Sequence, residues 1–482
     1  MPAYPAFIGG SYTAQSPIAD QERTINWYVE ASQVPGASEK LALYPTPGAT
    51  LLATAGTAQQ GRAHIAIGAR EFVIIGATFY EVNDIGALTD RSGGSALVTN
   101  DNPATISSNG DGGGELFITS GGNGYIYDLS LNTLGASITN IAGKADIGDS
   151  IDGYFLALDT STSTLWISDL LDGTTWDTTQ FIQRNIAPDP LVSMKVANRL
   201  IYLFGEQTSE VWYNNGTSPI PFVPHPSGLM QYGCAATFSP EVVGQGVCWL
   251  GQTKDGSGQV LHAEAFTPTV ISTYAMQVAV DAFTNIADAI GDTYSDLGHT
   301  FYLLSFPTGR ATWCWDDQTA LWHERGTWDE ATASYDIWRP VFHAFGYGQH
   351  RFLDAQGDSI YKVSSDIYTD IGGGVIRRLR RAPALSIENK RLFYSAFELD
   401  IETGTAPSGV TAEVMMRQSK DGGKTWGSER WRTAGALGEY SARVRWPRCG
   451  SARRMVFEVV ATAAMPWRVL GAWLSVVPTA DR

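Results

Sequence analysis

The eight residues from Ser419 to Trp426, SKDGGKTW, constrain the fold more than any other stretch of this chain. They fit the pattern Ser-x-Asp-x-Gly-x-Thr-Trp of the Asp-box, an element that closes a β-hairpin. The Ser and Asp side chains can hydrogen-bond turn amides, the glycines can adopt positive φ, and the Trp is expected to fill the gap beneath the turn. We therefore predict a structural Asp-box at Ser419, Asp421, Gly423, Thr425 and Trp426. The motif predicts an all-β fold and leaves enzyme and scaffold both open.

The composition favours many short strands joined by tight turns. The 482 residues include 51 Gly, 22 Pro and 15 Trp, and only 17% are charged. Glycine and proline punctuate turns, whereas aromatic residues are enriched in strands. The length suggests two or three domains, although propellers often exceed the usual size of one domain.

Short aromatic segments recur at irregular intervals and alternate apolar with polar residues. This period of two is typical of half-buried strands. Several segments follow glycine-rich turns, as hairpins require. The pattern predicts a β-propeller with irregular blades, whose number we leave open. The segments are FYEV (79–82), YIYDL (125–129), LWISDL (165–170), EVWYN (210–214), TWCWDD (312–317) and IYKV (360–363).

Charge divides the chain near residue 376. Residues 1–376 hold 15 Lys and Arg against 39 Asp and Glu, whereas residues 377–482 hold 18 against 10. The stretch GGGVIRRLRR, residues 372–381, crosses this change and is typical of a domain junction. We predict an acidic propeller body over residues 1–376 and a basic C-terminal module over residues 377–482.

The arginines of this stretch allow two interpretations. They could contact phosphate, or they could lie at a strand edge or subunit contact and pair with acidic neighbours, which we favour. The arginines are Arg377, Arg378, Arg380 and Arg381.

One segment, Tyr274 to Ile290, breaks the β pattern. Its apolar residues recur with the spacing of one helical face, and Ser272 or Thr273 could cap the helix. We predict a helical insertion near 274–290. It would either pack on a neighbouring subunit or line a lumen, or else cover an open face of the propeller.

No membrane span, metal site or cofactor is indicated. The start of the chain lacks a signal peptide, so we expect a soluble, non-secreted protein. The four cysteines, Cys234, Cys248, Cys314 and Cys449, form no metal or disulfide pattern and are expected to be reduced.

Three candidate sites have better structural explanations. HERG (His323 to Gly326) is expected to cap a blade turn, and the turn NGDGGGE (109–115) lacks a full set of calcium ligands. His343 and His350 could ligate a metal, but no third ligand stands at a suitable spacing. Phosphate-binding and nucleophile-elbow motifs are also missing from the sequence.

Several segments, in this order along the chain, resemble the packaged-DNA stabilisation proteins of short-tailed bacteriophages, which are tail hub or nozzle proteins. The resemblance covers most of the chain. It is carried by GSYTAQSPIADQERTINWYVE (10–30), the run from LWISDLLDG to EVWYNNG (165–216), CWLGQTKDG (248–256), VISTYAMQVAV (270–280), GHTFYLLSFPTGRATWCWDDQTALWHERGTW (298–328) and the Asp-box module.

The resemblance implies a propeller body, a β-sandwich over residues 377–482 and a ring of six copies. It further implies attachment to the tail adaptor beneath the portal, contact with a needle or tail fibre or spike, and transient passage of double-stranded DNA. Such a protein is made in the host cytoplasm and resides in the virion tail. It is not an enzyme. We expect part of the acidic excess to face the DNA channel, because a cationic lining would bind phosphate.

The alternative is a sialidase-like or glycan-binding soluble propeller. A sialidase needs an arginine cluster, an acid/base Asp and a Tyr/Glu nucleophile pair, usually with an Arg-Ile-Pro string early in the propeller. That string is absent. The sequence therefore favours the structural role over catalysis.

Overall fold

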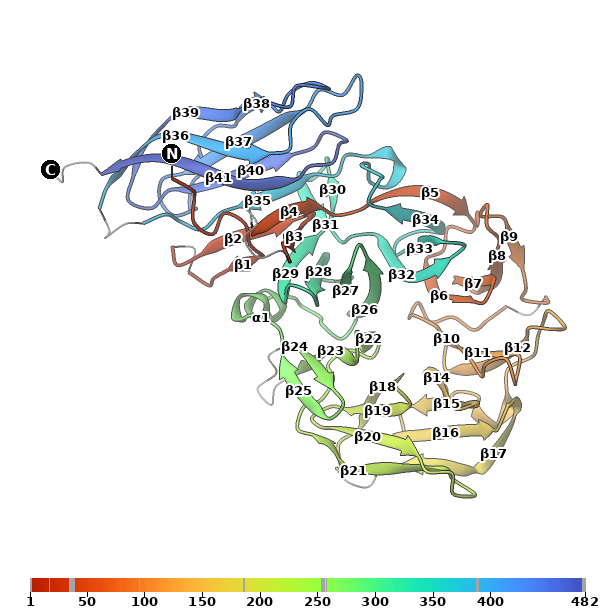
Figure 1. The fold of residues 1–482 in the computed structure, drawn as a ribbon. Coiled ribbons are helices and arrows are strands. Elements are labelled where there is room, and N and C mark those ends of the chain that lie inside the picture. Colours follow the sequence, from red (N-terminus) through yellow and green to blue (C-terminus); the bar gives the residue numbers. More distant parts are fainter. Residues whose placement is uncertain are drawn as a thin grey trace.

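The computed structural model describes residues 2–16, 18–33, 40–94, 96–184, 187–252, 256, 258–386 and 390–478. The strands form a ring of small antiparallel sheets and, beside it, a sandwich of two larger sheets (Figure 1). The prediction of an all-β propeller with a second β module is confirmed.

Seven four-stranded blades form the ring within the described residues. Each blade begins with its inner strand. The first three blades are β6 (Gly61–Ile67), β7 (Arg70–Ile75), β8 (Thr78–Val82) and β9 (Leu88–Asp90); β10 (Thr105–Ser108), β11 (Glu115–Ser120), β12 (Asn123–Asp128) and β13 (Thr133–Leu134); and β14 (Ile147–Ile151), β15 (Tyr154–Asp159), β16 (Thr164–Asp169) and β17 (Asp172–Gln183).

The remaining blades follow in chain order. They are β18 (Leu191–Ala197), β19 (Leu200–Gly205), β20 (Ser209–Asn214) and β21 (Phe222–Met230); β22 (Glu241–Val243), β23 (Gly246–Gln252), β24 (Gly258–Glu264) and β25 (Thr267–Val270); β26 (Ile290–Asp296), β27 (His299–Phe306), β28 (Ala311–Asp316) and β29 (Leu321–Arg325); and β32 (Pro340–Gly346), β33 (Gln349–Asp354), β34 (Ser359–Ser364) and β5 (Gly48–Thr54).

The predicted aromatic strands all fall on the third strand of a blade: β8, β12, β16, β20, β28 and β34. The third strand pairs on both sides and is covered by the neighbouring blades, so large apolar side chains fit there. The fifth blade does not follow this aromatic pattern, because its third strand, β24, has the sequence GQVLHAE.

An N-terminal strand closes the ring. β5 pairs antiparallel with β34, with Leu51 opposite Tyr361 and Ala49 opposite Val363. The last blade thus joins strands that are about 300 residues apart in the sequence. Opening the ring requires this strand pair, or the contacts between two blades, to separate.

The sandwich also takes strands from both ends of the chain. One sheet has the order β3 (Trp27–Ala31), β4 (Leu41–Pro45), β41 (Val469–Pro478), β36 (Leu392–Ile401) and β39 (Val444–Ala452). In the other sheet, β2 (Gln21–Ile25), β35 (Arg378–Arg381), β40 (Val456–Ala461), β37 (Glu413–Ser419) and β38 (Arg430–Thr433) lie in this order, and β1 (Tyr12–Thr13) pairs with β2. The division at residue 376 stays a prediction, to which the sheets add that the N-terminal strands β1 to β4 lie in the sandwich.

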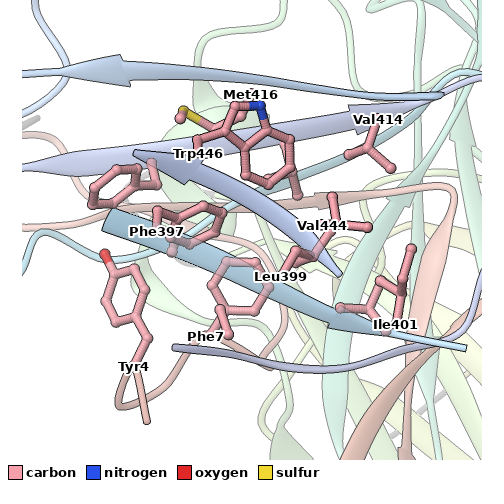
Figure 2. Close-up of a cluster of buried hydrophobic side chains, with 14 of the residues drawn as sticks. Tyr4, Phe7, Phe397, Leu399, Ile401, Val414, Met416, Val444 and Trp446 are labelled. Atoms are coloured by element: carbon pink, nitrogen blue, oxygen red, sulfur yellow. The ribbon is translucent and has the colours of Figure 1, made fainter. Parts of the chain in front are cut away.

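A single apolar core fills the sandwich (Figure 2). Tyr4 and Phe7 of the N-terminal segment contact Phe397 and Phe457 at ring-centroid distances of 5.9 to 6.1 Å. Trp446 lies against the same Phe397 from β39. The N-terminal segment is therefore part of the core rather than a tail.

The propeller and sandwich share one continuous sheet. Ile25 of β2 pairs in parallel with Glu324 of β29, so the sixth blade continues into the sandwich. The small hairpin of β30 (Thr327–Asp329) and β31 (Ser334–Asp336) follows β29 and packs Tyr335 against the apolar cluster of Leu379 and Val460. Both connections fix the two units relative to each other.

The helix α1 spans Tyr274–Asp281 and is shorter than predicted. Thr273 caps it by accepting a hydrogen bond from the Met276 amide, 3.2 Å. Met276 and Val280 are buried beside the fifth and sixth blades. The helix ends early because the Asn285 side chain accepts a bond from the Ala287 amide, which favours a turn over another helical turn. Two short 3₁₀ turns, Thr139–Ile141 and Ile371–Gly373, complete the elements.

Candidate functional site

The turn after β37 is closed by two side chains of the SKDGGKTW motif. The Asp421 carboxylate accepts bonds from the amides of Lys424 and Thr425, at 3.0 and 2.9 Å, and from the Thr425 hydroxyl at 2.6 Å. Ser419 Oγ accepts from the Gly423 amide at 2.8 Å and donates to Asp421 at 2.7 Å. Hydrogen bonds from Ser419 and Thr425 hold the pKa of Asp421 well below its usual range.

The glycines of this turn are required by conformation and by space. Gly422 and Gly423 have φ values of 75° and 97°. A Cβ on Gly423 would lie 1.9 Å from the Gln21 side-chain oxygen, and Gly422 faces Ile18. The turn therefore packs on the N-terminal segment. Any larger residue at position 423 would displace the Gln21 side chain of that segment.

Trp426 differs from the prediction, because it is half-buried and lies over charged residues rather than filling an apolar gap. The guanidinium carbons of Arg381 and Arg417 each lie 4.8 Å from its ring centroid. Both arginines pair with the buried Glu458, at 2.7 and 2.6 Å. The indole covers a ladder of charges across β35, β40 and β37, a contact that a cation–π interaction stabilises.

The arginines at the predicted junction contact segments that are distant in the sequence. Arg377 stacks on Trp328 at 4.3 Å and also on Tyr335, both in the β30–β31 hairpin. Arg380 is buried and donates to the carbonyls of Phe7 and Gly10, at 2.6 and 2.9 Å.

Arg378 of the same stretch is also buried, and burial lowers its pKa to about 10. Buried and stacked in this way, Arg377, Arg378 and Arg380 are unsuited to a phosphate ligand, which favours the structural interpretation.

The propeller axis contains two cavities of about 610 and 270 Å³. They meet at a collar of residues that line both: Pro103, Thr237, Phe238, Ile290 and Phe342. Phe342 has a φ of 57° at a bulge of β32, a left-handed conformation that is costly for a bulky residue. The collar divides the axis into two chambers.

A hydrogen bond joins the inner edges of every pair of neighbouring blades. Neighbouring blades are separate sheets without a ladder of backbone hydrogen bonds between them, and these single bonds link them instead. They are His64 Nδ1 with the Phe342 carbonyl, Ala104 N to Arg62 O, Gly148 N to Thr105 Oγ1, Val196 N to Asp149 Oδ2, Lys195 Nζ to Glu241 Oε1, Gly291 N to Phe238 O, and His343 N to Asp292 Oδ2.

Two buried carboxylates near the axis have raised pKa values. Burial, with Glu241 nearby, raises the pKa of Asp292 to about 8, and burial also raises the pKa of Asp149. Lys195 pairs with Glu241 at 2.6 Å in the same chamber. Among the described residues, no group of three or more His, Cys, Asp or Glu side chains is arranged to hold a metal ion.

The histidines considered from the sequence lie in packed surroundings. His323 is buried beside Arg325. Burial and the nearby Arg325 charge lower the pKa of His323 well below its usual value. His343 Nε2 lies 3.0 Å from His350 Nδ1, and burial lowers the pKa of His343 to about 3. Both therefore act as neutral packing groups.

The turn NGDGGGE and the cysteines also have structural surroundings. Glu115 of the turn accepts bonds from Asn109 at 2.8 Å and from the Gly173 amide of the next blade at 2.7 Å. The four cysteines are buried and free.

Sequence reasoning missed a charged cluster at His299. Its two ring nitrogens lie 2.9 Å from Asp316 and 2.7 Å from Glu30, which belongs to β3 of the sandwich. Burial opposes the charged form, but the two carboxylates outweigh it and raise the pKa of His299 to about 8. Because its partners are 17 and 269 residues away, no local motif signals the cluster.

Within the part of the chain that the structure describes, no helix has the length and hydropathy needed to cross a bilayer. A seven-bladed propeller joined through shared strands to a β-sandwich defines the class of the protein as all-β with two units. Comparison with family models then identifies the family of the chain. "Bacteriophage P22 Gp10, beta-propeller" matches residues 9–368, and "Bacteriophage P22 Gp10, beta-sandwich" matches residues 377–476.

The chain therefore belongs to the bacteriophage P22 Gp10 family. It is a phage tail structural protein that stabilises packaged DNA and resides in the virion. The predicted resemblance is confirmed. No curated protein matches the sequence.

Comparison with solved structures finds matches of low similarity. The N-terminal domain of Nup159 is 11% identical with a TM-score of 0.41, and covers 71% of this chain and 98% of its own. A chain of the mitotic checkpoint complex is 12% identical with a TM-score of 0.41, covering 65% and 93%. PorZ of Porphyromonas gingivalis is 11% identical with a TM-score of 0.37, covering 74% and 44%.

Proposed function

We propose that this protein is the tail nozzle or hub of a short-tailed phage. Six copies would form a ring below the portal and adaptor, close the DNA channel around the packaged genome, and conduct the DNA during ejection. A needle and tail fibres or spikes would attach further down. Its role is structural rather than catalytic. The two family matches, which cover nearly the whole chain in the order propeller then sandwich, carry this proposal.

The closed axis of the propeller supports a DNA channel between subunits. The collar side chains separate two chambers of only about 610 and 270 Å³ along the axis. A DNA duplex needs a continuous opening, so its path would lie at the centre of the ring of copies. The acidic excess of residues 1–376 would then line part of that path and limit phosphate binding.

We further propose that the chain divides functionally near residue 376. The basic module would be locked by the Asp-box at Ser419, Asp421, Gly423, Thr425 and Trp426. The hydrogen bonds of Asp421 within the turn support this role. After synthesis in the host cytoplasm, the module would contact acidic surfaces of neighbouring proteins.

Particles made without this protein test the proposal. We expect them to package DNA and then lose it, and we expect cryo-electron microscopy of complete virions to place a ring of this chain beneath the adaptor. A complete virion without this chain in its tail, or retention of DNA in its absence, would contradict the proposal. Hydrolysis of a fluorogenic glycoside that one carboxylate substitution abolishes would contradict the structural role.

A further inference from the structure

One face of the propeller exposes large apolar side chains at its hairpin tips. In the first six blades, the hairpins between the first and second strands and between the third and fourth strands end on this face, and in the last blade the hairpin between β32 and β33 does; we call it the tip face. Single exposed apolar residues are ordinary, but a set gathered on one face indicates an interaction site. They are Ile85 (75% exposed), Leu131 (70%), Leu170, Leu297 (65%), Phe345 and Tyr347.

The tips of neighbouring blades lie against one another and form a continuous surface. The Tyr347 hydroxyl of the last blade donates to the Val82 carbonyl of the first, at 3.1 Å. A Cβ on Gly112 would contact Leu171 of the next blade at 3.5 Å, and one on Gly244 would lie 3.2 Å from Asp317. The exposed residues therefore belong to one surface rather than to isolated loops.

The tip face also carries carboxylates that have no ion-pair partner among the described residues. Hydrogen bonds from the Leu131 amide and the Thr174 hydroxyl lower the pKa of Asp128 and Asp172, respectively, so both stay charged at neutral pH. The carboxylates are Asp84, Asp111, Asp128, Asp172, Glu264 and Asp317.

The sandwich presents the opposite charge along the edge formed by β38 and β39. These strands end the two sheets, and Figure 1 shows them on the side of the sandwich away from the propeller. Trp446 Nε1 donates to the Arg430 carbonyl at 2.8 Å and Arg432 Nε donates to the Arg445 carbonyl at 3.0 Å, which joins the strands. We call this surface the basic edge; its cations are Lys420, Arg430, Arg432, Arg445, Arg448 and Arg453.

The basic edge combines these cations with exposed apolar and aromatic groups. Trp431 is 45% exposed, Leu437 is 60% exposed and Tyr440 is 74% exposed. Of the six cations, only Arg445 has an ion-pair partner among the described residues, Glu398 at 3.9 Å. Arg, Trp and Tyr are the residues that dominate binding energy in protein interfaces.

We propose that the basic edge of one copy docks on the tip face of a second copy of this chain. The two surfaces match in kind, because both combine exposed apolar groups with unpaired charges, and they are opposite in sign. Two different surfaces on one chain give a heterologous contact, which closes into a ring or continues as a filament. This inference rests on the proposed ring and identifies the surfaces that would build it.

A second copy fits the basic edge better than DNA does. The chain has a net charge of −16, so a duplex approaching it is repelled at long range. Phosphates would also leave Trp431, Leu437 and Tyr440 without apolar partners, whereas the leucines of the tip face supply them. If DNA bound the basic edge, the exposed apolar tips of the propeller would also remain uncovered.

A charge-swap experiment tests the docking directly. Sedimentation of the full chain over increasing concentration would measure self-association. We expect Arg432→Glu with Arg448→Glu, and separately Asp111→Lys with Asp172→Lys, each to weaken association at least about tenfold. Mixing the two variants should restore association, because the reversed edge of the first then meets the reversed face of the second.

A matched control reverses Lys144 and Arg310 to Glu. Both residues lie on the opposite propeller face, and the change in net charge equals that of the edge variant. We expect this control to associate like the unmodified chain. Circular dichroism and thermal unfolding would verify that every variant folds.

Several outcomes would overturn the docking. These are a chain that stays monomeric at all concentrations tested, equal weakening by the control, or no recovery on mixing. Binding of a DNA duplex that depends on Arg432 and Arg448, without self-association, would assign the edge to nucleic acid instead. Virions that contain this chain while the docking fails would leave the proposed function standing, and virions that lack it would contradict the function itself.

Discussion

The propeller and the sandwich are stabilised in different ways. The propeller divides its apolar residues among separate clusters between blades and links neighbouring blades by hydrogen bonds near the axis. The sandwich has one core to which both ends of the chain contribute. A change in a blade should therefore act locally and through polar bonds, whereas a change in the sandwich core should affect the whole module.

Trp446→Ala should give the largest loss and would test the single-core description. The indole is fully buried between the two sheets, so its removal should destabilise the sandwich by about 3 to 5 kcal/mol. Urea unfolding followed by tryptophan fluorescence would measure this. A loss below about 1 kcal/mol would show that the core relaxes into the space.

Arg351→Met should show how strongly the propeller depends on a buried polar bond between blades. Arg351 pairs with Glu71 at 2.9 Å, and both side chains are inaccessible to solvent. The change leaves the buried Glu71 with only the His64 ring nitrogen, 2.9 Å away, as an ion-pair partner among the described residues, and should cost about 3 kcal/mol.

The exposed pair of Arg199 with Asp152 is the control for Arg351, and Arg199→Ala should change stability by less than about 1 kcal/mol. Both values come from denaturant unfolding. Equal effects of the two variants would contradict the importance of burial.

His299 should give the junction between the two units a pH dependence. Its folded pKa of about 8 lies above the unfolded value of 6.5, so its contribution is fully present below pH 6.5 and is lost as pH rises through 8. We expect a loss of about 2 kcal/mol across this window. Unfolding measured between pH 6 and 9 would detect it. His299→Gln should remove the part of the dependence that His299 causes, while the part that comes from Asp292, whose pKa is also about 8, should remain.

Trp426→Ala should give the smallest of these effects. The indole is half-buried over Arg381 and Arg417, so its loss should cost about 1 to 2 kcal/mol, less than Trp446→Ala. Trp431→Ala, at an exposed position on β38, serves as a control with little expected change. A loss from Trp426→Ala as large as that from Trp446→Ala would restore the prediction of an indole plug in an apolar gap.

Local patterns predicted the local structure well. Alternation in segments such as EVWYN located six strands, each of which is the third strand of a blade, and Thr273, one of the two candidate caps, caps the helix. The helix end was less predictable, because the Asn285 turn competes with an apolar face that continues to Ile290.

Contacts between distant residues could not be predicted. Nothing near Gly48 indicates that this strand completes a blade with Ser364, and nothing near His299 points to Glu30. The surroundings of Trp426 depend in the same way on Glu458, whose position follows from sheet order and not from the motif.

The position of the first strands has a consequence for the order of folding. β2 to β5 leave the ribosome long before their distant sheet partners β29, β34, β35 and β41 exist. The middle blades can form while synthesis continues, but ring closure must wait for β34 and the sandwich must wait for β41. The newborn chain therefore carries unpaired strand edges, which favour aggregation. A chain that terminates before β34 can complete neither unit, and one that terminates between β34 and β41 can close the ring but cannot complete the sandwich.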